Sequence, residues 1–190
     1  MLALDPRTTA LVLIDLQKGV LAMPLAPHGA AQVVQNAARL GLHFDEVGAV
    51  VALVHVAFSD KAVDRLSQPV DAPPAPAALP ADWADFAPEI GSLHADIIIT
   101  KRQWGAFYGT DLDLQLRRRG LTTIILCGIA TEIGVESTAR DAYERGCELI
   151  FASDAMTGTN AESHLNSVVR IFPRMGRVRS TEQIVAALQS

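Results

Sequence analysis

Three positions that could do chemistry each follow shortly after a run of apolar residues. Asp15 closes the run TALVLID, Lys101 follows ADIIIT, and the turn from Ala130 to Gly134 comes just after TTIILC. A carboxyl group beside an ammonium group can move a proton or hold a charge. A turn that opens a helix offers free backbone amides to a developing negative charge. These positions are candidates for an acid, its charge partner and an oxygen-binding turn.

The apolar runs alternate with segments of helical length, which predicts an α/β fold with a doubly wound parallel sheet. Residues 30–47 place apolar side chains three to four positions apart, as one buried face of a helix requires. The runs are unbroken, which is typical of parallel strands covered on both faces. Strands are expected at residues 9–15, 49–58, 95–100, 122–127, 147–153 and 176–180.

Such a sheet determines where its polar residues meet. Ligands of open parallel sheets bind in the crevice beyond the carboxyl ends of the strands. Asp15, Lys101 and the turn before Gly134 all lie at such ends, so we expect them to converge on one edge of the sheet. The helix expected from about Glu132 to Arg145 then points its positive end at the space between the acid and the ammonium group.

Aromatic residues follow Lys101 in the loop RQWGAFYGT. Trp104, Phe107 and Tyr108 are candidates for the wall of a substrate pocket, because aromatic side chains beyond a strand end suit a planar ligand. The alternative is that one or two of them fill the space between the loop and the next helix.

Three further polar residues have two explanations each. Gln17 either orients Asp15 or faces solvent. Glu132 either acts as a general base at the turn or only complements the helix dipole. His55 either points into the cleft or is a hydrogen-bonded core histidine. All three are kept as candidate substrate-binding residues.

The 190 residues, of which 49% are apolar, predict one domain over residues 1–190. Six of the ten prolines fall between residues 57 and 91, which predicts a long loop that is a lid or a subunit contact. Trp83 and Phe86 within this loop either cover the cleft or anchor the loop to its own core.

Composition also excludes several kinds of partner. The net charge of -5 comes from 16 basic and 21 acidic residues spread along the chain, so nucleic acid is not an expected partner. No apolar run approaches the roughly 20 residues of a membrane span, and the chain start does not resemble a secretory signal. We therefore expect a cytoplasmic protein. The five histidines lack metal-ligand spacing, so neither a metal nor another cofactor is expected.

Three segments together resemble the isochorismatase-like hydrolase superfamily. They are LVLIDLQ at residues 11–17, TKRQWGAFYGTDLDLQL at 100–116 and CGIATEIGVESTARDAYERG at 127–146, followed by IFPRMGRV at 171–178. The resemblance implies a three-layer α/β/α, Rossmann-type sheet of about six mainly parallel strands. Most members are cysteine hydrolases that act on amides through an aspartate, a lysine and a cysteine.

By position, Asp15 and Lys101 match the aspartate and the lysine, whereas Gly134 stands where the pattern G-I-A-T-x-x-C has its cysteine. A glycine offers no attacking atom, which closes the acyl-enzyme route. Isochorismatases proper also carry glycine there and hydrolyse a vinyl ether without a covalent intermediate. The resemblance therefore implies Asp15 as general acid, Lys101 as the charge partner that orients substrate, and the amides of Ala130 and Gly134 as oxygen donors. It also implies a cis peptide bond between Ile129 and Ala130.

Two hypotheses follow for the activity. The first is a hydrolase of non-covalent mechanism that acts on a vinyl ether or a related small carbonyl compound. The second is a catalytically silent member that binds a metabolite or supports an assembly, and Gly134 is compatible with it because glycine also permits close helix packing. The resemblance implies a homo-oligomer, and the sequence does not identify the substrate.

Overall fold

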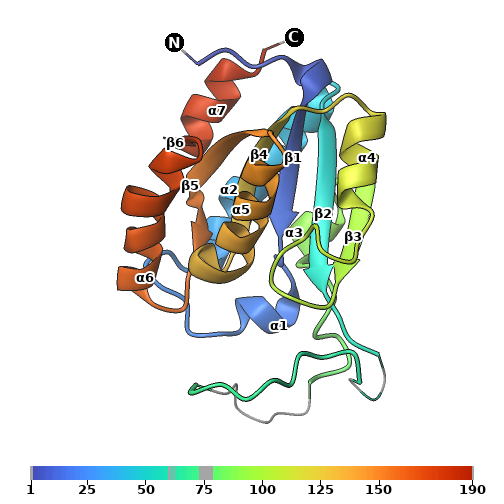
Figure 1. Ribbon diagram of the computed structural model, residues 1–190. Helices are drawn as coiled ribbons and strands as arrows, with labels where there is room; N and C mark the ends of the chain where they lie inside the picture. Colours follow the sequence, from blue (N-terminus) through green and yellow to red (C-terminus); the bar gives the residue numbers. More distant parts are fainter. Residues whose placement is uncertain (1, 60, 62, 73–78, 190) are drawn as a thin grey trace.

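The computed structural model describes residues 2–59, 61, 63–72 and 79–189. Its centre is a sheet of six parallel strands in the order β3-β2-β1-β4-β5-β6 (Figure 1). The strands are β1 (Thr9–Ile14), β2 (Val50–Val56), β3 (Ile97–Lys101), β4 (Thr123–Ile129), β5 (Glu148–Thr157) and β6 (Arg177–Arg179). The predicted doubly wound α/β fold is confirmed.

Helices cover both faces of the sheet. The α-helices are α1 (Lys18–Leu21), α2 (Ala30–Glu46), α3 (Pro88–Gly91), α4 (Leu112–Arg118), α5 (Glu136–Glu144), α6 (Ala161–Asn166) and α7 (Thr181–Ala187). Two 3-10 turns lie at Pro6–Thr8 and Phe172–Arg174, and two π-helical turns at Thr131–Val135 and Ser167–Ile171. Helices α2, α3 and α7 pack into one core and α4 and α5 into the other, which gives the three layers.

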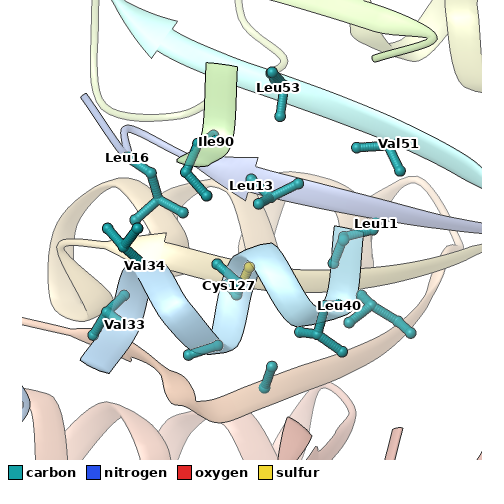
Figure 2. Close-up of a cluster of buried hydrophobic side chains, with 14 of the residues drawn as sticks. Leu11, Leu13, Leu16, Val33, Val34, Leu40, Val51, Leu53, Ile90 and Cys127 are labelled. Atoms are coloured by element: carbon teal, nitrogen blue, oxygen red, sulfur yellow. The ribbon is translucent and has the colours of Figure 1, made fainter. Parts of the chain in front are cut away.

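The alternation of side chains along β1 produces these two cores. Leu11 and Leu13 point into the core shared with α2, where they lie among Val33, Val34 and Leu40 (Figure 2). The intervening residues of β1 point to the opposite face and join the second core. All six residues of β1 are buried, as the unbroken apolar run predicts for a strand covered on both sides.

The strand order reverses beside β1. The chain adds β2 and β3 on one side of β1 and then returns to add β4, β5 and β6 on the other. A crevice opens at such a switch point, beyond the carboxyl ends of the two central strands. Asp15 follows β1 and the turn before Gly134 follows β4, so both lie at this point.

Two elements differ most from their predicted bounds. Strand β5 continues to Thr157, past the polar residues Ser153 and Asp154, because its pairing with β4 resumes at Gly128 in a shifted register, beyond a bulge. The segment predicted as one helix from about Glu132 begins instead with the π-helical turn Thr131–Val135, and α5 starts only after it. Turns of this kind are frequent at functional sites.

The proline-rich segment between β2 and α3 has no helix or strand among its described residues, apart from an isolated bridge between Phe86 and Gln17. In Figure 1 it runs beyond the carboxyl ends of the strands. Trp83 and Phe86 pack against the first core, so these two side chains anchor the segment to its own chain. Pro73, Pro74 and Pro76 lie outside the described residues, and the choice between lid and subunit contact stays a prediction.

In the described part of the chain, no helix is both long enough and apolar enough to cross a lipid bilayer.

Candidate active site

The structure brings Asp15 and Lys101 together at the carboxyl edge of the sheet. Lys101 is the last residue of β3 and reaches past β2, so that its Nζ lies 2.6 Å from Oδ2 of Asp15. The Lys101 residue is 2% exposed and Asp15 is 6% exposed. Each charge needs the other at this depth, because an unpaired buried ion is costly.

The ammonium group of Lys101 uses all of its hydrogens within the protein. Besides the bond to Asp15, Nζ donates to the carbonyl of Gln103 at 3.1 Å and to that of Trp104 at 2.9 Å. An ammonium group has three hydrogens to donate, so none is left for a substrate while these bonds hold. In this arrangement Lys101 is the charge partner of Asp15, and its role in orienting substrate stays a prediction.

One carboxylate oxygen of Asp15 has no hydrogen-bond partner among the described residues. This oxygen, Oδ1, is buried. Burial raises the pKa of Asp15 from 3.8 to about 6, although the charge and hydrogen bond of Lys101 act in the opposite direction. The backbone of Asp15 has φ 51°, a left-handed conformation that costs a non-glycine residue about 1 kcal/mol. Strain and a free buried oxygen at one residue are typical of a functional site.

Gly134 faces the acid directly. A Cβ atom at this position would lie 3.2 Å from Oδ2 of Asp15 and 3.0 Å from Cγ2 of Ile14. A side chain at position 134 would therefore point at the carboxyl group, and glycine leaves that place open. The peptide bond between Ile129 and Ala130 is cis, as the resemblance implies, and the Ala130 carbonyl accepts a bond from the amide of Ile133 at 3.0 Å.

Another glycine allows β4 to approach β1 at the site. Gly128 has φ 113°, and a Cβ atom there would collide with the backbone of Ile14. Only glycine combines this backbone conformation with such close contact. Gly128 thus allows the close approach of β1, which ends just before Asp15, and β4, which leads into the turn that carries Gly134.

Gln17 has a structural role that neither sequence explanation foresaw. Its side chain is fully buried, and Oε1 accepts a bond from the Val56 amide at 2.8 Å. Nε2 donates to the carbonyls of Val56 at 3.0 Å and Trp83 at 3.2 Å. Gln17 therefore ties the ends of β1 and β2 to the proline-rich segment, and it neither orients Asp15 by a hydrogen bond nor faces solvent.

His55 is held on both ring nitrogens. Nδ1 lies 2.8 Å from the carbonyl of Ala84 and must carry the proton of that bond, because a carbonyl only accepts. Nε2 lies 2.8 Å from the hydroxyl of Thr100, and the ring stacks on Phe86 at 4.9 Å between centroids. These contacts correspond to the hydrogen-bonded histidine, and His55 is also among the groups that lower the pKa of Asp15.

The three aromatic residues after Lys101 have different environments. Trp104 is 61% exposed and Tyr108 is 76% exposed, so both are free to contact a ligand or another molecule. Phe107 is 4% exposed and belongs to the second core, where the guanidinium of Arg145 lies 4.7 Å from its ring centre. These contacts correspond to the alternative, in which Phe107 fills the space between the loop and the next helix, and its place in a pocket wall stays a prediction.

Glu132 is occupied by the segment that follows β5. Its Oε1 accepts a bond from the Thr159 amide at 3.1 Å, and Oε2 is buried without a hydrogen-bond partner among the described residues. A Cβ atom at Gly158 would collide with this carboxylate, so glycine makes room for it. Glu132 anchors the end of β5 to the turn, a contact that neither explanation from the sequence included.

The sequence reasoning missed Thr138, whose buried hydroxyl lies 2.7 Å from the carbonyl of Gly134. It also missed the two loop carbonyls, at Gln103 and Trp104, that hold Lys101. The available signal for Thr138 was its position four residues after Gly134, one helical turn away. The described residues contain no group of three or more His, Cys, Asp or Glu side chains able to hold a metal ion.

A comparison with protein-family models identifies the family of this chain. The family model described as "Isochorismatase domain" matches residues 9–183. The chain belongs to the isochorismatase family. This family is one of hydrolases, and Asp15, Lys101 and Gly134 lie within the matched region.

Relatives of the family match over nearly their whole length. An uncharacterized isochorismatase family protein of Escherichia coli O157:H7, YecD, is 53% identical over 99% of this chain and 100% of its own. A second, YwoC of Bacillus subtilis, is 51% identical over 97% of this chain and 96% of its own. A solved isochorismatase family protein of Burkholderia thailandensis superimposes with a TM-score of 0.94 at 42% identity, covering 100% of both chains.

Proposed function

We propose that this protein is a small-molecule hydrolase that works without a covalent intermediate, with Asp15 as its general acid and base. The observation that carries the proposal is the Asp15 carboxyl group: its buried Oδ1 has no hydrogen-bond partner among the described residues, and its Oδ2 faces Gly134, which has no side chain that could attack. A protonated carboxyl group can donate to a substrate from this place, and the same carboxylate can later take a proton back.

The substrate class that fits is a vinyl ether of the isochorismate type or a related small carbonyl compound. Asp15 donates its proton to the enol carbon, and water adds to the carbon that bears the ether oxygen and returns a proton to Asp15. The hemiketal then breaks its bond to the alcohol, whose oxygen takes the hydroxyl proton, and a ketone forms. The amides of Ala130 and Gly134 stabilise the oxygen that gains charge.

The surrounding residues divide the remaining tasks. The charge of Lys101 lowers the pKa of Asp15 against the effect of burial, so that the carboxyl group can also lose its proton within the working pH range. Trp104 and Tyr108 are exposed and remain candidates for contact with substrate. Gln17, His55 and Glu132 act by holding backbone around the site.

The test is a panel of vinyl ethers, amides and ureas, assayed with the wild-type protein, with Asp15→Asn and with Asp113→Asn. Asp113 is a half-exposed partner of Arg117 on α4 and serves as the matched control. We expect one vinyl ether or small carbonyl compound to be hydrolysed, Asp15→Asn to lower kcat by 10²–10⁴-fold, and the control to match wild type.

Activity that requires protonated Asp15 should fall tenfold per pH unit above a pH of about 6.

Turnover that persists in Asp15→Asn contradicts the proposal. Tight binding of a metabolite without turnover of any compound, unchanged in Asp15→Asn, supports the catalytically silent alternative instead. A homo-oligomer in the cytoplasm remains a prediction, and light scattering measures the mass of the assembly.

A further inference from the structure

Thr138 joins two parts of the site that are far apart in the sequence. Its side chain is fully buried in α5, and its hydroxyl donates to the carbonyl of Gly134 at 2.7 Å. The same oxygen accepts the backbone amide of Ala106 at 3.1 Å. A threonine hydroxyl often bonds to the carbonyl one turn back in its own helix. The bond from Ala106 is different, because it comes from the loop after β3.

That loop is the one that holds Lys101. The carbonyls of Gln103 and Trp104 take two of the three ammonium hydrogens, and Asp15 takes the third. Ala106 comes two residues after Trp104, so the Thr138 hydroxyl fixes the loop directly beside the carbonyls that set the position of Nζ.

The loop is closed on itself and lies against α5. Thr110 donates to the carbonyl of Ala106 at 2.6 Å, and Gln103 donates to that of Gly105 at 3.1 Å. A Cβ atom at Gly105 would lie 3.3 Å from Oδ2 of Asp141 on α5. A loop that is stiff in itself moves as one body, so its contact with α5 decides where the two carbonyls stand.

We infer that Thr138 is a positioning residue: its hydroxyl fixes the loop that holds Lys101 to the turn at Gly134, so that the ammonium group stays on Asp15. The effect of Thr138 on catalysis rests on the proposed function. The placement of the ammonium group, in contrast, can be measured without any substrate. Lys101 and His55 are the charged or titratable groups whose field acts on Asp15. A loosened Lys101 stabilises the carboxylate less, and the pKa of Asp15 then rises.

The test compares pairs of variants that differ only by a hydroxyl group. Thr138→Val keeps the shape of threonine and removes the hydroxyl, and Thr138→Ser and Thr138→Ala form a second pair in case the valine variant does not fold. Thr9→Val is the matched control, because the hydroxyl of Thr9 is also buried but has no partner among the described residues. The readout is the titration of the Asp15 carboxyl group by infrared difference spectroscopy, assigned by its loss in Asp15→Asn.

We expect Thr138→Val and Thr138→Ala to raise the midpoint of Asp15 by about one pH unit, with wild-type values in Thr138→Ser and Thr9→Val. For any compound that is turned over, kcat should fall about tenfold in the variants that lack the hydroxyl, with little change in KM. An unchanged midpoint in a folded Thr138→Val or Thr138→Ala variant overturns the inference, whatever happens to its melting temperature. A shifted midpoint restored by serine, with no compound hydrolysed by wild type, supports the positioning role and counts against the proposed hydrolase.

Discussion

Replacing Lys101 with methionine should make the stability of the protein depend more strongly on pH. Methionine keeps most of the length of the side chain but removes the charge beside Asp15. In the wild-type protein the pKa of Asp15 is raised from 3.8 to about 6, and each pKa unit corresponds to about 1.4 kcal/mol. The free energy of unfolding should therefore fall by about 3 kcal/mol as the pH rises from below 4 to above 6.

The sign follows from proton binding. A carboxyl group with a higher pKa in the folded state binds its proton more tightly there, so low pH favours folding and the benefit is lost as pH rises through the folded pKa. In Lys101→Met the two effects of Lys101 that lower the pKa of Asp15, its charge and its hydrogen bond, disappear. We expect the pKa to rise by a further 1–3 units, roughly the range reported for a lost opposite charge. The stability loss then extends to about pH 8 and grows by roughly 1–4 kcal/mol.

Urea unfolding at intervals from pH 4 to pH 9 measures this effect. Lys18→Met is the control, because Lys18 pairs with Asp82 and Asp85 at the exposed surface. The difference in unfolding free energy between wild type and Lys101→Met should widen with pH, and the control should run parallel to wild type. The reasoning is refuted if the difference stays constant over the whole range, because the lysine would then stabilise packing without acting on the ionisation of Asp15.

The remaining predictions concern glycines and thiols. Gly134→Ala should change the unfolding free energy by less than about 1 kcal/mol, because the higher helix propensity of alanine offsets the two tight contacts of its Cβ atom. It should nevertheless lower kcat/KM about 100-fold. Gly91→Ala, whose Cβ atom would make only ordinary contacts, is the control for the steady-state assays and the melting experiments. Gly128→Ala should destabilise the fold by about 3 kcal/mol or more, because position 128 has a φ of 113° and an added Cβ atom would collide with the backbone of Ile14. A urea-unfolding midpoint equal to that of wild type would contradict this. Iodoacetamide should leave turnover intact, since burial raises the pKa of Cys127 to about 12, and Cys147 comes before the start of β5, whereas Asp15 follows the end of the parallel strand β1. Mass spectrometry counts the labelled thiols, and inactivation would point to a covalent route.

The sequence determined the layers of the fold and the elements that carry the site. Unbroken apolar runs require strands buried on both faces, and this is a local property that needs no knowledge of the partner strands. Asp15 and Lys101 could also be chosen as site residues from the local sequence, because a charged residue directly after a buried run is costly unless it has a function. The bounds of β5 were harder to predict, since the bulge that extends it depends on pairing with β4.

Only the tertiary structure decided which side chains contact each other at the site. The order of strands puts β2 between β1 and β3, and Lys101 bonds to Asp15 because it reaches past that strand. The partners of Gln17, His55 and Glu132 come from distant segments, and no pattern within one element specifies them. Hydrophobic periodicity is local and can be predicted from neighbouring residues, whereas a buried hydrogen bond depends on how the whole chain packs.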